Sequence, residues 1–168
     1  MTRILLLVCL VAGLSFGQQP PTIAGAAKTA AGNAYNLVIR SAEKMPEGDF
    51  GFKPVDTVRS FGQILGHVAD ANYMFCSSVK GEANPAPGIE KNKTTKAEIV
   101  AALKAGKEYC DAALADLSET KMVKRGEREL PAVNVVNSMN GHTMEHYGNL
   151  VTYMRIKGQV PPSSEPRK

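Results

Sequence analysis

Two histidines four residues apart, His142 and His146, lie in the stretch 141–149 near the C-terminal end of the chain. The surrounding residues have helical periodicity, so both imidazoles face the same side of a helix, one turn apart. At that spacing the two rings can bind one transition-metal ion without distortion of the backbone. The third histidine of the sequence, His67, also falls in a helical stretch. Three histidine ligands with an open fourth position are typical of catalytic zinc sites, so we predict a metal centre formed by His67, His142 and His146.

Four amphipathic helices are predicted to position these residues, because apolar side chains recur at helical spacing in four stretches. The predicted helices run from Thr22 to just before Pro46, from Ser60 to Val79, from Thr95 to Leu117 and from Pro131 to Gly158. Ser60 with Gln63, and Thr95 with Glu98, form capping boxes at the starts of the second and third helices. The charged segment 118–130 shows no convincing strand. The sequence therefore predicts an all-α four-helix bundle, with its connectivity left open.

The positions of the histidines favour a shared site. If the second and fourth helices run antiparallel, His67 and His146 stand at heights that agree to about one helical turn. His67 taken alone is more typical of a half-buried polar residue, and the pair His142 and His146 fits either reading equally well. Only the common geometry of all three favours a metal. Gly62 and Gly66, inside the predicted second helix, indicate either close packing or room for a ligand.

Three polar residues are predicted to surround the metal ligands. Asp70 and Asn149 can accept hydrogen bonds from the second ring nitrogen of a ligating histidine. Glu145 is expected to be a surface acid or to contact a ligand indirectly. The spacing of His142, Glu145 and His146 matches an inverted zinc-protease motif. We reject that assignment because helical projection places Glu145 about 100° from His146, away from the apolar face.

The first 17 residues are predicted to be a secretory signal peptide. Arg3 precedes the apolar run 4–14, and the small residues Ser15 and Gly17 favour cleavage after Gly17. The apolar run is too short to span a bilayer. We therefore expect residues 18–162 to form one domain, exported to the periplasm or the extracellular space without a membrane anchor, and residues 163–168 to be a disordered tail.

Composition restricts the functions of this domain. The formal net charge is +4 at pH 7, the basic residues are scattered and Trp is absent. These features argue against nucleic-acid binding.

After signal cleavage two cysteines remain, Cys76 and Cys110. The sequence leaves open whether they form a disulfide or are buried free thiols.

The stretch 60–70, which contains His67, and the stretch 142–150, which contains His142 and His146, together resemble the DinB/YfiT superfamily over nearly all of the mature chain. The resemblance implies a four-helix bundle of DinB type with a crossover, so that the second and third helices are parallel. It implies that the three histidines bind a divalent metal, most often zinc or nickel. Parallel helices would also bring Cys76 and Cys110 to similar heights, and the resemblance allows a homodimer.

The resemblance also defines the expected activities. We expect a metal-dependent hydrolase that acts on a small-molecule substrate through a metal-bound water. A thiol-dependent transferase is the first alternative, and export disfavours it because small thiol cofactors are scarce outside the cytoplasm. The second alternative is a non-catalytic metal-binding or assembly module. It is favoured because no obvious nucleophile, oxyanion donor set or Lys/Arg clamp accompanies the triad.

Overall fold

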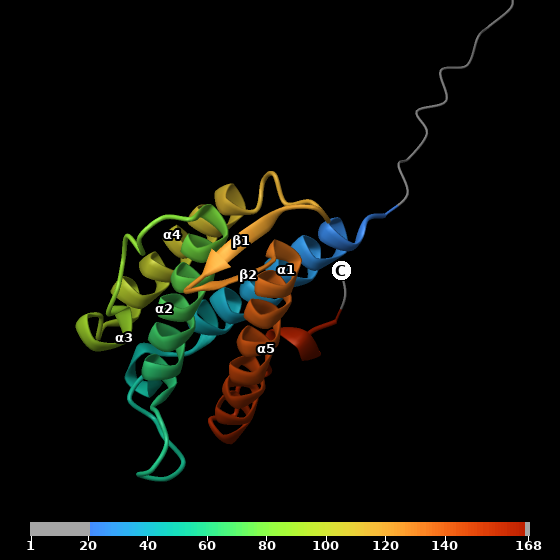
Figure 1. Ribbon diagram of the computed structural model, residues 1–168. Coiled ribbons are helices and arrows are strands. Elements are labelled where there is room, and N and C mark those ends of the chain that lie inside the picture. The colour runs from blue at the N-terminus through green and yellow to red at the C-terminus, as the bar shows by residue number, and fades with distance from the viewer. Residues whose placement is uncertain (1–20, 167–168) are drawn as a thin grey trace, which may run out of the picture.

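The computed structural model describes residues 21–166, which form an all-α bundle with one small hairpin (Figure 1). The signal peptide predicted at residues 1–17 lies outside this part of the chain. The elements, in order, are α1 (Ile23–Lys44), a 3₁₀ turn (Glu47–Asp49), α2 (Phe61–Lys80), α3 (Ile89–Asn92), α4 (Lys96–Ala113), β1 (Met122–Arg125), β2 (Arg128–Pro131), α5 (Ala132–Ile156) and a second 3₁₀ turn (Pro162–Ser164). Within residues 21–166, no helix combines the length and apolarity that crossing a bilayer requires.

The four long helices pack in a ring in which α2 lies between α4 and α5, and α1 contacts α4 and α5. The starts of α2 and α4 lie together, since a Cβ on Gly62 would stand 3.4 Å from the Ile99 side chain. Their ends lie together as well, because Cys76 and Cys110 are joined by a disulfide. The two helices are therefore parallel, which confirms the predicted crossover.

Helices α2 and α5 are antiparallel. Tyr153, near the end of α5, donates a hydrogen bond of 3.0 Å to the carbonyl oxygen of Arg59, just before α2 begins. At the opposite end of the bundle, Cys76 of α2 lies 3.5 Å from the sulfur of Met139 in the first half of α5. This arrangement brings the middle of α2 opposite the middle of α5, where the predicted metal ligands lie.

The helix starts agree with the capping residues of the sequence. Thr22 accepts a hydrogen bond of 2.9 Å from the backbone N–H of Gly25 at the start of α1. Both predicted capping boxes are present, at Ser60 for α2 and at Thr95 for α4. These bonds satisfy backbone donors that the first turn of a helix leaves without partners.

Two segments differ from the predictions. Residues 122–131 form an antiparallel hairpin that lies against the end of α2 (Figure 1). Its two-residue loop begins with Gly126 at φ 64°, the positive value that a type II′ turn needs at this position. Val123 is the only buried residue of β1, so the segment lacks the apolar alternation by which strands are recognised.

The second difference is the C-terminal segment, which was expected to be disordered from residue 163. Its described part is ordered up to Pro166, because Ser163 donates its backbone N–H to the Tyr147 hydroxyl at 2.9 Å. The Glu165 carboxylate forms ion pairs with Arg40 and Lys44 of α1. These contacts with α5 and α1 fix the segment against the bundle.

Candidate metal centre

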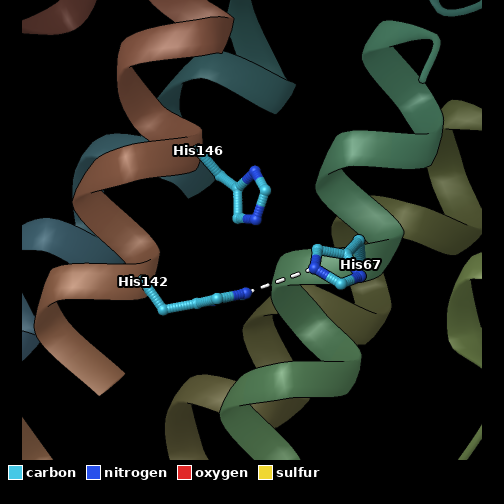
Figure 2. A group of neighbouring side chains, drawn as sticks. All are labelled: His67, His142 and His146. Atoms are coloured by element: carbon cyan, nitrogen blue, oxygen red, sulfur yellow. Dashed lines mark hydrogen bonds between the residues drawn. The ribbon is translucent and has the colours of Figure 1, made fainter. Parts of the chain in front are cut away.

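The three histidines predicted as metal ligands point toward one another from α2 and α5 (Figure 2). His142 and His146 project from one side of α5 next to the buried residues Thr143 and Tyr147. His67 projects from the first half of α2, which faces them. All three side chains are half-buried, so the rings are held by the bundle and still reach its surface.

The ring nitrogens are close enough to share one ion. The Nε2 atoms of His67 and His142 lie 3.2 Å apart. One ligand atom from each histidine can be chosen so that all three lie within 4.8 Å of one another. Two nitrogens bound tetrahedrally to zinc at 2.0–2.1 Å would stand roughly 3.3 Å apart, which is close to the spacing of the His67 and His142 nitrogens. The three histidines could therefore hold a metal ion.

The surroundings favour the neutral form of two of these histidines. Burial lowers the pKa of His142, and the neighbouring His67 adds to this effect. Burial, followed by the charges of His142 and His67, lowers the pKa of His146 from 6.5 to about 4. A neutral imidazole is the form that binds a metal, so at neutral pH both rings are ready to act as ligands.

Glu90 contacts the centre, and the sequence did not identify it. Its Oε2 atom lies 3.2 Å from Nδ1 of His67. A carboxylate at Nδ1 fixes the proton on that nitrogen and leaves Nε2, which faces His142, free to bind a metal. Glu90 also accepts a hydrogen bond of 2.9 Å from Nε of Arg59 through its other oxygen. Glu90 therefore links Arg59 to a candidate metal ligand.

Gly66 is the sequence feature that could have indicated a residue in this position. A Cβ on Gly66 would lie 2.8 Å from Cα of Glu90. The absent side chain lets α3 approach α2 closely enough for Glu90 to reach His67. The interpretation of Gly66 as a sign of close packing is therefore correct, but its packing partner lies in the loop region after α2 and not in another long helix.

Asp70 does not contact His67 as predicted. Its two carboxylate oxygens accept hydrogen bonds of 2.8 Å from the backbone N–H groups of Ile89 and Glu90. These are the first residues of α3, where helical N–H groups have no partner within the helix. Asp70 therefore fixes the backbone of Glu90 and affects His67 only through that residue.

Asn149 also lacks the predicted contact with a ligand, and Glu145 is a surface acid, the first of its two expected roles. Both are exposed on α5. The Nδ1 atoms of His142 and His146 are buried and have no hydrogen-bond partner within residues 21–166. Of the three polar residues predicted to surround the ligands, none hydrogen-bonds to a ligand nitrogen. The exposure of Glu145 agrees with the rejection of the protease motif.

A cleft of about 690 Å³ opens beside His146. It lies between α5, the start of α2 and the loop that precedes α2, and its lining includes Lys53, Arg59, Ile64, His146, Asn149 and Tyr153. Ligand sites commonly have volumes of about 300–1,000 Å³, so the cleft can accept a small molecule in contact with a metal ligand.

A four-helix bundle with parallel second and third long helices, and three histidines between α2 and α5, defines the class of this protein. The chain belongs to the DinB superfamily, whose sequence profile matches residues 32–150. It is 24% identical over 131 residues to the uncharacterized protein YjoA of Bacillus subtilis (strain 168), covering 74% of this chain and 84% of that protein. The crystal structure of YjoA, described as DinB-like, superimposes with a TM-score of 0.67 at 21% identity. The match covers 85% of this chain and 99% of the other, and supports the fold.

Proposed function

We propose that this protein binds one divalent metal ion, zinc or nickel, through His67, His142 and His146, and that it acts as a metal-dependent hydrolase on a small molecule. The observation that carries the proposal is the convergence of the three ligand atoms within 4.8 Å. Their nitrogen donors suit zinc and nickel better than calcium or magnesium, which prefer oxygen ligands. A bound cation of this kind supplies Lewis acidity that lowers the pKa of water toward neutrality.

Residues of the chain itself would orient the histidine ligands and keep them in the form that binds a metal. Glu90 holds the His67 ring so that Nε2 faces the other two histidines. The lowered pKa values of His142 and His146 keep both rings unprotonated at neutral pH. The cleft beside His146 supplies a volume for a substrate next to one of the three candidate ligands. Three protein ligands leave a further coordination position, which is the arrangement of catalytic and not structural sites.

We further propose that the mature protein works outside the cytoplasm. Support comes from the predicted signal peptide and from the Cys76–Cys110 disulfide, since disulfides persist in oxidising compartments. Cell fractionation, with N-terminal sequencing of the exported form, tests this proposal. The expected first residue is Gln18.

A non-catalytic metal-binding role is the second candidate. It is favoured by one observation: within residues 21–166, no carboxylate hydrogen-bonds to His142 or His146, and Glu145 is exposed. A protein of this kind would hold the cation without a nearby proton acceptor for turnover.

Elemental analysis of the mature protein tests metal binding directly. The wild type should carry about one divalent metal per chain, and the His67→Ala, His142→Ala double variant should carry none. The metal-loaded protein should then hydrolyse members of an ester, amide and phosphoester panel, and the double variant should not. Stoichiometric metal without hydrolysis would support the second candidate. A wild type that binds no metal would refute both.

A further inference from the structure

Arg59 stands at the point where the cleft beside the triad meets a second hollow. The cleft of about 690 Å³ contains Arg59 and His146 in its wall. The second hollow, of about 720 Å³, shares Lys53, Arg59 and Gln63 with the first. Its wall adds Lys91 and Lys93. A molecule that occupies the cleft against His146 therefore also meets Arg59.

The charged residues around the two hollows are mainly basic. Four bases line them, against two acids, Asp56 and Glu90. Asp56 forms an ion pair with Lys53 at 3.2 Å and is almost fully exposed to solvent. Glu90 is engaged by both Arg59 and His67. Lys53 and Arg59 are thus both in ion pairs, and the excess positive charge comes from Lys91 and Lys93 in the second hollow. A divalent cation at the triad would add positive charge beside the cleft.

Several contacts hold Arg59 in place. Its carbonyl oxygen accepts the Tyr153 hydroxyl hydrogen bond at 3.0 Å. The next residue, Ser60, is the N-cap of α2 and is fixed by its capping box. The loop that contains Arg59 is closed by a hydrogen bond of 2.9 Å from the Phe61 N–H to the carbonyl oxygen of Phe52. The guanidinium is therefore presented from an anchored backbone.

Only one of the three guanidinium nitrogens of Arg59 has a hydrogen-bond partner within residues 21–166. The hydrogen bond to Glu90 occupies Nε, and it is the one side-chain hydrogen bond or ion pair of Arg59 found in the described part of the chain. The side chain remains 45% exposed. The terminal nitrogens can therefore donate a pair of parallel hydrogen bonds to a carboxylate or a phosphate, which is the geometry that Arg favours.

We propose that the cleft recognises a small oxyanionic substrate, and that Arg59 binds its carboxylate or phosphate group next to the metal centre. The proposal deepens the proposed function and rests on it for the reaction, but anion binding by Arg59 can be measured without a metal. Arg59 then has two roles, because Nε fixes Glu90 behind His67 while the terminal nitrogens hold the substrate. Lys53 adds charge at the same wall of the cleft.

The test is a titration of the metal-free mature protein with inorganic phosphate and, separately, with acetate, followed by amide shifts in ¹⁵N NMR spectra. Wild-type protein should show saturable shifts centred on Arg59, Lys53 and Asn149. Arg59→Gln should bind the anion at least about tenfold more weakly, because a hydrogen bond to a charged group contributes roughly that factor. Arg128→Gln, which alters an exposed arginine on the hairpin, should bind as the wild type does.

Lys53→Gln provides a second variant if Arg59→Gln does not fold, and it should also weaken binding. Saturation by phosphate alone assigns a phosphate-bearing substrate, and saturation by acetate alone assigns a carboxylate. Equal affinity in wild type and in the folded cleft variants, or shifts centred away from the cleft, would overturn the proposal. Failure of the proposed function would instead appear as the absence of metal binding, with Arg59-dependent anion binding retained.

Discussion

The Nδ1 atom of His67 and the Oε2 atom of Glu90 lie 3.2 Å apart, although 23 residues separate them in the chain. Carboxylates in this position orient a ligating imidazole, and their loss commonly lowers metal affinity 10–100-fold. Asp70 and Gly66 make the contact possible, the first by hydrogen bonds to the start of α3 and the second by its lack of a side chain. The candidate centre thus depends on a four-residue helix that carries no metal ligand.

Glu90→Ala should weaken zinc or nickel binding by roughly 10–100-fold while all three histidines remain. Competition with a chromophoric chelator would measure the dissociation constant. Glu82→Ala is the matched control, because Glu82 is an exposed acid in the same connection whose ion pair is with Lys80. An affinity for Glu90→Ala equal to that of the control would show that Glu90 does not position His67.

Gly66→Ala should destabilise the fold by about 1–3 kcal/mol, the usual range for overpacking, because its Cβ would lie 2.8 Å from Cα of Glu90. Metal affinity should also fall, because α3 would move away from α2 and Glu90 would lose its contact with His67. Gly32→Ala in α1 is the control, since nothing lies within 4 Å of a Cβ there. That change should leave stability unaltered or raise it by up to about 1 kcal/mol. Urea unfolding of both variants decides the point, and equal stability would refute the close contact.

The Cys76–Cys110 disulfide should stabilise the mature protein by about 2–4 kcal/mol, given the sequence separation of 34 between its cysteines. A Cys76→Ala, Cys110→Ala double variant should unfold at correspondingly lower urea concentration. Reductant should lower the melting temperature of the wild type and leave that of the double variant unchanged. Detection of two free thiols in the denatured, unreduced mature protein would contradict the disulfide.

Stability of the metal-free protein should fall as the pH is lowered from 6.5 toward 4. The pKa of His146 is 6.5 in the unfolded chain and about 4 in the folded protein, and the pKa of His142 is also lowered by burial. Between pH 4 and pH 6.5 the unfolded state binds more protons than the folded state, so the free energy of unfolding rises with pH. Above pH 6.5 the histidines no longer lower the stability. Urea unfolding across this range should show a smaller pH dependence for His146→Phe. An unchanged dependence would show that His146 is not responsible.

The sequence predicted the parts of the fold that local chemistry determines. Helical periodicity and the caps at Thr22, Ser60 and Thr95 correctly located the starts of α1, α2 and α4. The convergence of His67 with His142 and His146 followed from helical spacing and one assumption, that α2 and α5 run antiparallel.

Long-range contacts were not predictable in the same way. Glu90 lies in a polar loop region, and nothing in its own neighbourhood indicates that it reaches His67. Asp70 was assigned to His67 because the two are one helical turn apart, whereas its carboxylate satisfies the N–H groups of Ile89 and Glu90. The C-terminal segment was expected to be disordered because it is a chain terminus beyond the last helix. The ion pairs of Glu165 with α1 depend on the folded arrangement.

Helix α2 is joined to α4 by a covalent bond and faces α5 through the histidine triad. A cation bound at the triad would act as a second, reversible crosslink, so that α2 would be fastened to a different neighbour on each side. Separation of α5 from α2 would then require release of the ion. The rate of metal exchange would therefore report how often the interface between α2 and α5 opens.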